Sequence, residues 1–194
     1  MAGTNKQADI VAAAVQLFHQ KGFHATSMQE IADAVGLQKG SLYHYISSKE
    51  ELLAVIIQGV IDQYNARLEA VSALDLPVRQ RLELAVRNHL QGIADNVAML
   101  TIFLRESYAL NSAQQSLIGA ATARYNRMFE ELYQEGVSTG EFRPRDPRLV
   151  TRTLLGACNW FHRWFRPEGA QSVEELAGSM VEILFQGIAA EDSA

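Results

Sequence analysis

One short segment is crowded with polar and amphipathic side chains that suit contact with a base or a phosphate. They are Gln38, Lys39, Ser41, Tyr43 and His44. Glutamine pairs with adenine, lysine with guanine or phosphate, and serine with either. On a short helix that turns Leu42 toward a core, these side chains would face outward, and Gly40 has no Cβ to keep the backbone away from a partner. The segment therefore predicts a surface that contacts nucleic acid.

Residues on either side of this segment are suited to phosphates. Thr26 or Ser27 begins a helix whose first amides and dipole favour anions, and Glu30 completes a capping box with Ser27. Lys49, at the start of a long helix, would supply a second phosphate contact. Tyr45 is expected to pack inside instead.

A second cluster combines aromatic and cationic side chains near the C-terminus. Trp160 and Trp164 lie four residues apart and therefore share one helix face, as do Asn159 and Arg163, with Arg166 close by. One interpretation is the mouth of a site for a large anionic ligand. The alternative is an aromatic helix end that packs at a subunit interface.

Helical periodicity and capping signals account for the whole chain. We expect about nine helices, at residues 5–21, 26–36, from 38, 48–70, 77–94, 96–109, 111–139, 149–165 and 172–190. Gly22, Gly36 and Gly140 are placed to end helices, and Pro77 and Pro147 to begin them. No segment has the period of a strand, so the predicted fold class is all-α.

Composition limits the protein class. The 194 residues are 48% hydrophobic with four prolines, which is typical of a compact helical protein. A single cysteine excludes an internal disulfide and any cysteine-based zinc cluster. No signal peptide or membrane-spanning segment is recognisable, so we expect a cytoplasmic protein without membrane contact. The net charge of −5 argues against non-specific binding along nucleic acid. It is compatible with a small N-terminal DNA-binding domain attached to an acidic C-terminal domain.

From Thr26 through Leu53 the sequence resembles the DNA-binding domain of the TetR family of transcriptional regulators. The matching residues are Gly22-Phe23, Thr26-Ser27, Ile31-Ala32, Val35-Gly36, Lys39-Gly-Ser-Leu-Tyr-His-Tyr45 and Ser48-Lys-Glu-Glu-Leu-Leu53. Ile46 departs from the aromatic residue that is common there. The resemblance implies a helix-turn-helix domain over residues 1–50, a connecting helix over 48–70 and a ligand-binding and dimerisation domain over 51–194. It also implies a ligand-released repressor of double-stranded operator DNA, with no cofactor.

The tryptophan segment is similar to the Asn-Trp…Trp-Phe-(Arg/Lys)-Pro-x-Gly pattern of TetR-type repressors of fatty-acid or sterol degradation, which respond to acyl-coenzyme A (acyl-CoA). That resemblance implies that Arg163 and Arg166 attract the coenzyme phosphates and that Trp160 or Trp164 lines the site. Candidates for an acyl tunnel are Met99, Leu100, Phe103, Leu104, Tyr125 and Phe129. The same residues would also serve as an ordinary helical core. Another apolar effector, or an interface without ligand, therefore stays open.

The last two long helices are expected to form a homodimer through a mixture of large and small residues. The residues concerned are Leu154, Leu155, Gly156, Ala157, Val173, Leu176, Ala177, Gly178, Met180, Ile183 and Leu184. Two-fold symmetry would place the two copies of the predicted DNA-contacting helix from residue 38, the reader helix, on successive major grooves. It therefore predicts a near-palindromic operator.

Two other function classes compete with a DNA-binding regulator. An enzyme would need Cys158 and His162, one helical turn apart, to form a nucleophile or metal pair, but no third partner is evident. The adjacent Glu130 and Glu131 point apart on a helix. We therefore predict no catalytic residue and no metal site. A purely structural adaptor would bind no duplex DNA.

Overall fold

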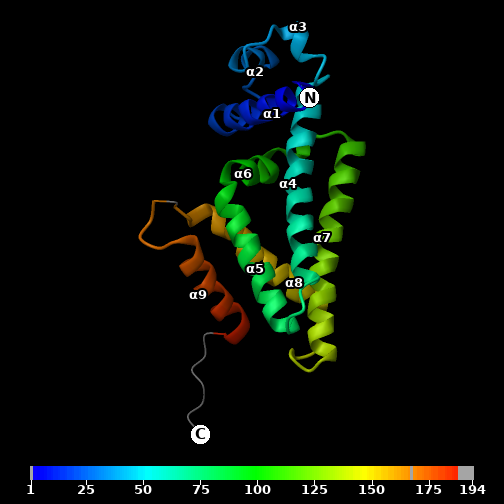
Figure 1. Cartoon of the computed structure of the whole chain (residues 1–194), viewed down its shortest axis with the longest axis vertical. Coiled ribbons are helices and arrows are strands. Elements are labelled where there is room, and N and C mark those ends of the chain that lie inside the picture. Colours follow the sequence, from blue (N-terminus) through cyan, green and yellow to red (C-terminus); the bar gives the residue numbers. More distant parts are fainter. Residues whose placement is uncertain (1, 167, 188–194) are drawn as a thin grey trace. The chain divides into compact units, whose positions relative to one another are not determined.

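The computed structural model describes residues 2–166 and 168–187, and within these ranges it contains nine α-helices, one short 3-10 helix and no strand (Figure 1). The helices are α1 (Ala2–Lys21), α2 (Met28–Ala34), α3 (Lys39–Leu42), α4 (Lys49–Ser72), α5 (Val78–Asp95), α6 (Val97–Glu106), η1 (Ser107–Ala109), α7 (Ser112–Ser138), α8 (Pro147–Trp164) and α9 (Val173–Gln186). The predicted all-α fold is confirmed. The end predicted for the last helix, near residue 190, lies outside the described residues.

The chain divides into two compact units. Unit 1 consists of Met1–Gln63 and Asn96–Ala123, and unit 2 consists of Tyr64–Asp95 and Arg124–Ala194. Both α4 and α7 contribute residues to each unit. Because α6 belongs to unit 1, the division by packing differs from a simple cut near residue 50. The predicted functional boundary at that point stays a prediction.

Local sequence signals set the first helix boundaries. α1 ends where Gly22 adopts a φ of 87°, a conformation that costs other residues a clash at Cβ. The ring of Phe23 then turns back and meets Phe18 edge to face, with centroids 5.2 Å apart. Of the two predicted caps for α2, Ser27 is the one in place, and it forms the full capping box with Glu30.

Two serines share the capping of α4. The Ser48 hydroxyl accepts a hydrogen bond from the Glu51 amide at 3.0 Å. The Glu51 carboxylate, however, accepts from the amide and the hydroxyl of Ser47 and not from Ser48. These hydrogen bonds from Ser47 lower the pKa of Glu51.

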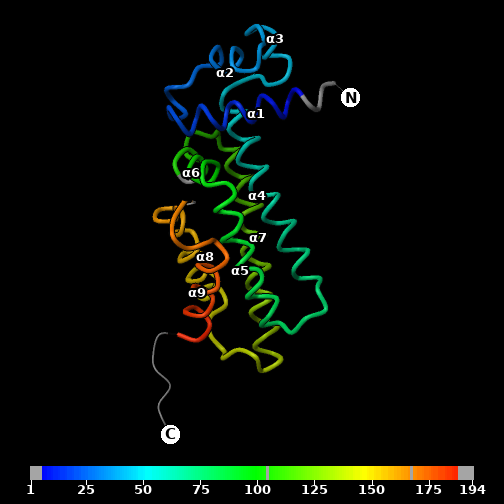
Figure 2. The backbone as a smooth tube through the Cα atoms, turned by 60° about the vertical axis from the view of Figure 1, so that its left-hand side comes forward, coloured from blue at the N-terminus to red at the C-terminus, as the bar shows by residue number. Residues whose placement is uncertain are grey.

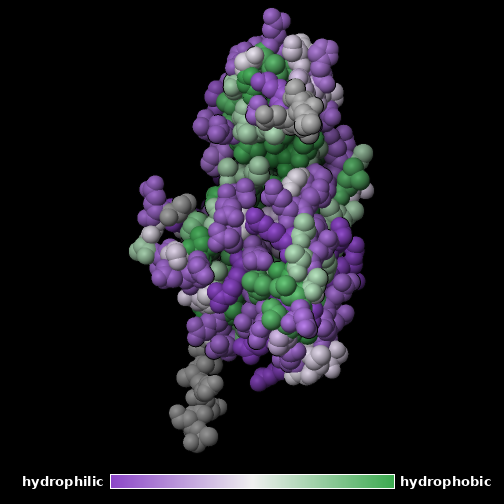
Figure 3. Space-filling model, in the orientation of Figure 1, coloured by the Kyte–Doolittle hydropathy of each residue, from purple (hydrophilic) through white to green (hydrophobic). Residues whose placement is uncertain are grey.

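The core of unit 1 is built from aliphatic and aromatic side chains. α1 packs against α2 and α6, and α2 packs against α3. The buried cluster consists of Ile10, Ala14, Phe18, Phe23, Met28, Ile31, Ala32, Leu42, Ile46, Leu52, Leu53, Ile56, Ile57, Ile61, Ile102, Leu110 and Ile118. Figure 3 shows hydrophobic side chains gathered on the drawn face below α1, where α6 approaches it. Burial of these apolar side chains holds α2 and α3 against the rest of the unit 1 core.

In unit 2, α5 packs against both α8 and α9, as the tube in Figure 2 shows. The face of α5 that is buried carries Leu82, Val86, His89 and Ile93 at helical spacing. The histidine is therefore part of the core stripe of its helix, and this places it at the centre of the candidate ligand region described below.

Candidate DNA-binding surface and ligand region

The polar residues of α3 face outward because Leu42 and Ile46 anchor the segment. Leu42 is fully buried and Ile46 is 2% exposed. Gln38, which precedes the helix, is exposed together with Lys39 and Gly40. The side chains that follow on the same surface are Tyr43, at 44% exposure, and the exposed His44, with Ser41 half-buried. The structure thus brings the predicted reader residues together on one short, outward-facing element.

Thr26 does not fit its predicted role. Its side chain is 1% exposed, and its hydroxyl donates to the carbonyl of Gly22 at 2.9 Å. The hydroxyl holds the end of α1 to the start of α2 and is not available to a phosphate. Ser27 is exposed, but its hydroxyl is engaged with Glu30. A hydrogen bond from Lys21 is the main reason that the pKa of Glu30 falls to about 2, so this carboxylate is ionised beside Ser27.

The side chain of Lys49 is also bonded within unit 1. Its Nζ donates to the carbonyls of Phe23 and Thr26, both at 2.8 Å, and to that of His24 at 3.3 Å. The same ammonium lies 4.5 Å from the centroid of the Phe23 ring. Since its donors are directed at the loop before α2, Lys49 ties that loop to the start of α4, and its predicted contact with a phosphate stays untested.

Tyr45 is a further correction. We expected it to pack inside, but the side chain is 37% exposed, and Ile46 takes the buried position. The backbone explains the exchange, because the amides of both residues bond to the carbonyl of Leu42 as the short helix ends. Tyr45 therefore joins Tyr43 on the exposed side of the segment.

The predicted acyl-tunnel residues fall in both units. Met99, Leu100 and Phe103 are on α6 in unit 1, while Tyr125 and Phe129 are on the part of α7 in unit 2. Phe103 packs against the core cluster of unit 1. Leu104 is also on α6, but its side chain lies outside the described residues. One tunnel lined by all six residues stays a prediction.

A buried aromatic and polar cluster occupies unit 2. His89 bonds through Nδ1 to the hydroxyl of Tyr125 at 2.9 Å and through Nε2 to the side-chain oxygen of Asn159 at 3.2 Å. Tyr64 packs against this pair, with its ring centroid 5.1 Å from that of His89. Its buried hydroxyl has no hydrogen-bond partner among the described residues. Phe129 is fully buried, and its ring packs edge to face against that of Tyr125.

Burial controls the ionisation of this cluster. Loss of solvent lowers the pKa of His89 to about 4, although the bond to Asn159 opposes the shift. Burial also raises the pKa of Tyr64 and Tyr125. All three side chains are therefore neutral near pH 7. Sequence reasoning missed His89 and Tyr64, but a histidine in line with Leu82, Val86 and Ile93 was the signal that could have revealed the site.

The end of α8 places its aromatic side chains on two sides. Phe161 is fully buried and Phe165 is 5% exposed, whereas Trp160 is 62% and Trp164 is 44% exposed. The guanidinium of Arg163 lies over the Trp160 ring, 5.7 Å from its centroid. The predicted aromatic and cationic surface is thus present, with Arg166 also exposed, and Asn159 points instead to His89.

Two models of known protein families match this chain. Residues 10–56 match the model of bacterial regulatory proteins of the tetR family. Residues 75–188, more than half of the chain, match the tetracyclin repressor-like C-terminal domain. The protein belongs to the TetR family. It is therefore a member of a family of DNA-binding transcriptional regulators.

Individual TetR relatives match along nearly the whole chain. The HTH-type transcriptional repressor KstR2 of Rhodococcus jostii (strain RHA1) is 27% identical over 188 residues, covering 96% of this chain and 92% of the relative. The fatty acid metabolism regulator protein of Bacillus subtilis (strain 168) is 25% identical over 188 residues, covering 94% and 95%. The crystal structure of AibR with isovaleryl coenzyme A and operator DNA is 30% identical, with a TM-score of 0.84 and coverage of 93% and 98%.

The cysteine and histidine of α8 are not arranged as a reactive pair. Cys158 is fully buried, and burial raises the pKa of its thiol to about 12, which disfavours the thiolate that a nucleophile requires. Nδ1 of His162 contacts the backbone oxygen of Asn159. Among the described residues no group of histidine, cysteine and carboxylate side chains could hold a metal ion. No described helix of this TetR protein is long and apolar enough to cross a membrane.

Proposed function

We propose that this TetR-type regulator is a ligand-released repressor that binds a near-palindromic operator as a homodimer. The observation that carries the proposal is the outward set of polar side chains on α3, held in place by the buried Leu42. The proposed DNA contacts are Ser27, Gln38, Lys39, Gly40, Ser41, Tyr43 and His44. Thr26 and Lys49 are left out because their side-chain polar atoms are bonded to backbone carbonyls inside unit 1. Ser27 is kept for its exposed position at the N-terminus of α2.

The shape and chemistry of α3 support major-groove binding. Its exposed side chains offer the donors and acceptors that read base edges, and Tyr43 and Lys39 can also reach phosphates. The helix is short and has few cations, so base contacts and a second subunit must supply much of the affinity. In a two-fold dimer the two copies of α3 would meet successive major grooves, about 34–36 Å apart or further.

The dimer surface that we propose differs in detail from the sequence prediction. Leu154, Leu155 and Ala177 are buried within the subunit, at 7%, 8% and 3% exposure. Apart from the two tryptophans, which we assign to the effector below, the large apolar side chains left exposed are Leu149 on α8 and Ile183 on α9, at 62% and 52% exposure. Gly156 also lies on α8, and a Cβ there would meet open space. Large apolar side chains beside a glycine suit the close approach of a partner helix.

The effector that we propose is an acyl-CoA. The relatives support it: one is a fatty acid metabolism regulator, and another, AibR, was solved with isovaleryl coenzyme A. In this chain, Arg163 and Arg166 beside exposed tryptophan rings suit the phosphates and the adenine ring of a coenzyme. The buried hydroxyl of Tyr64, which lacks a partner among the described residues, suits a polar group of the acyl part.

Release would follow from a difference in effector affinity between two conformations. Because α4 and α7 run from unit 2 into unit 1, a rearrangement around Tyr64 and Tyr125 has a covalent route to the DNA-binding helices. Thermodynamic linkage requires only that the effector bind the released conformation more tightly. Equal effector affinity in the presence and absence of operator would contradict this mechanism.

Operator binding is tested with the double variant Lys39→Ala, Tyr43→Ala. We expect loss of retention of a promoter fragment in a gel-shift assay, with the dimer and the melting temperature unchanged, because both side chains are exposed. Tyr108→Ala is the matched control, since Tyr108 is 86% exposed on η1 and outside the proposed contacts. Retention by the double variant, or unfolding of it, would overturn the assignment.

The effector is tested by thermal shift with acyl-CoAs of graded chain length, free coenzyme A, free fatty acids and aromatic drugs. A ligand at about 100 times its Kd stabilises the folded state by about 2.7 kcal/mol, which raises Tm by several degrees. Arg163→Gln with Arg166→Gln should weaken an acyl-CoA and leave a free fatty acid unaffected. A shift only with fatty acids or drugs would establish another apolar effector instead.

A further inference from the structure

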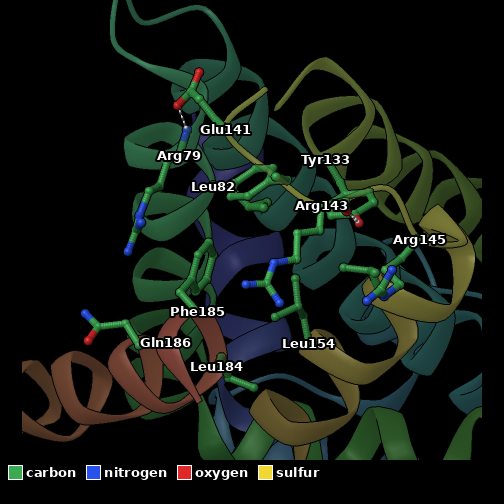
Figure 4. A pocket seen from close by; sticks show the side chains of 12 residues that line it. Arg79, Leu82, Tyr133, Glu141, Arg143, Arg145, Leu154, Leu184, Phe185 and Gln186 are labelled. Atoms are coloured by element: carbon green, nitrogen blue, oxygen red, sulfur yellow. Dashed lines mark hydrogen bonds between the residues drawn. The ribbon is translucent and has the colours of Figure 1, made fainter. Parts of the chain in front are cut away.

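A pocket of about 420 Å³ lies at the ends of α5, α7, α8 and α9, wholly within unit 2 (Figure 4). Its size is within the range of about 300–1,000 Å³ that is typical of small-molecule sites. None of the residues proposed above for the effector lines it. The loop between α7 and α8 forms one wall of the pocket and supplies Phe142, Arg143 and Arg145 to its lining.

The loop is held in a defined conformation. The Tyr133 hydroxyl donates to the carbonyl of Arg143 at 2.5 Å, and the amide of Phe142 donates to the carbonyl of Gly136 at 2.9 Å. A Cβ at Gly136 would lie 2.2 Å from the Phe142 ring, so only glycine admits that ring against α7. Specific contacts therefore hold this wall of the pocket in place.

The charges of the pocket leave a cationic surplus. Three arginines and one carboxylate line it. The carboxylate of Glu141 accepts the amides of Val78 and Arg79, at 3.3 and 3.0 Å, and thus serves the start of α5. Arg79 itself is paired with Glu83 at 2.9 Å. Neither Arg143 nor Arg145 has a carboxylate partner among the described residues, and Figure 4 shows the Arg143 guanidinium pointing between Phe185 and Leu154.

Beside these cations the walls are apolar. The rings of Tyr133 and Phe142 stack with centroids 5.6 Å apart, and Phe142 also meets Phe185 at 6.1 Å. Leu82, Leu154 and Leu184 complete the surface. A cation without a carboxylate partner next to aromatic and aliphatic walls favours a ligand that has one anionic group and one apolar body.

We propose that this pocket is a binding site for a small organic anion, separate from the effector region. The anionic group would be held by Arg143 and Arg145, and the apolar body would lie against Tyr133, Phe142 and Phe185. The ligand class includes aromatic and medium-chain aliphatic carboxylates. The site uses no residue of α3, so its failure would leave the proposed operator binding untouched.

The probe for this site is 2-naphthoate, titrated into the full-length protein and followed by calorimetry and by the arginine Nε–H signals in NMR. Binding should perturb the signals of Arg143 and Arg145. Loss of one charge-assisted hydrogen bond should weaken Kd about tenfold in R143Q or R145Q. R148Q is the matched control, because Arg148 is an exposed arginine at the start of α8 that does not line the pocket, and its Kd should stay within about twofold.

Two comparison ligands test the anionic group and the apolar body separately. The neutral 2-naphthamide and inorganic phosphate should each bind at least about tenfold more weakly, since each lacks one of the two recognised features. Decanoate in place of 2-naphthoate decides between aliphatic and aromatic bodies within the class. Unchanged affinity in the variant R143Q/R145Q, or equal binding of 2-naphthamide, would overturn the proposal. Displacement of 2-naphthoate by decanoyl-CoA would merge the pocket with the effector site and refute its separateness.

Discussion

Unit 1 fills its core with aliphatic and aromatic side chains, whereas unit 2 buries a network of polar groups. Among the described residues of unit 1, the buried polar one is Thr26, whose hydroxyl is bonded to Gly22. Those of unit 2 include His89 and Thr151, and its Tyr64 hydroxyl is buried without a partner among the described residues. Buried polar groups stabilise a fold less than apolar packing does and are most costly where a partner is missing.

The difference indicates a division of labour. A unit that presents a reader helix needs one stiff geometry, which close apolar packing supplies. A unit that responds to a ligand needs groups whose hydrogen bonds change when the ligand arrives. The polar cluster of unit 2, with its unpartnered Tyr64 hydroxyl, is the group that the proposed effector would rearrange. The same contrast predicts how each unit responds to substitution.

The largest expected effect is in unit 1. Leu42→Ala should lower the free energy of unfolding by about 2–5 kcal/mol, because Leu42 is fully buried and its removal leaves a cavity under α3. Urea denaturation measures the loss, and operator binding should fall with it. Leu117→Ala, at a 68% exposed residue of the same unit, should change stability by less than about 0.5 kcal/mol. Equal losses would mean that α3 is not held by its core.

The next effect depends on pH and belongs to unit 2. His89 has an ordinary pKa of 6.5 and a folded-state pKa of about 4, so between these values the unfolded chain binds more protons. Stability should therefore rise with pH across this window and be lost as pH falls from 6.5 toward 4. The full difference is on the order of 3 kcal/mol. Unfolding free energies measured at pH 7 and pH 5 test this, with His89→Gln removing the dependence and the exposed His44→Gln keeping it.

Lys49→Met should destabilise by about 1–3 kcal/mol, since it removes the donor shared by the carbonyls of Phe23 and Thr26. Lys39→Ala, at an exposed residue, should change stability by less than about 0.5 kcal/mol and yet weaken operator binding. Thermal denaturation beside gel-shift titration separates the two lysines. If Lys49→Met kept its full stability and weakened DNA binding instead, the tie assigned to Lys49 would be wrong.

The smallest expected effect is Tyr64→Phe. Removing a buried hydroxyl that has no partner should raise the free energy of unfolding by up to about 1 kcal/mol. Tyr133→Phe is the opposite case, because its hydroxyl bonds to the carbonyl of Arg143, and it should destabilise by about 1 kcal/mol. A lower free energy of unfolding in Tyr64→Phe would contradict this prediction, because it would mean that the Tyr64 hydroxyl stabilises unit 2.

Helix boundaries followed from the sequence because their causes are local. Ser27 and Ser172 form capping boxes with the residue three positions on, and Gly22 and Gly140 adopt the positive φ that ends a helix. Leu42 as the buried anchor of α3 also followed, since one apolar residue in a polar segment has to face the core. These features need only neighbours in the chain.

Features that depend on distant neighbours did not follow. Thr26 and Lys49 have the residue types of phosphate contacts, but Lys49 bonds to carbonyls more than twenty positions away, at Phe23 and Thr26. His89 meets Asn159 from seventy positions away, so its partner could not be read from spacing. The division of the acyl-tunnel candidates between two units did not follow either, since periodicity marks α6 as apolar without saying which unit it joins.

The ammonium of Lys49 has a mechanical consequence. It ties the first turn of α4 to the loop from Phe23 to Thr26, and that loop leads directly into α2. A rotation that reaches the beginning of α4 must therefore carry α2 and α3 with it as one solid piece. Side chains of α4 as far as Ile61 also belong to the core cluster of unit 1, so any bending between the proposed effector region and the DNA-binding helices is left to positions beyond that residue.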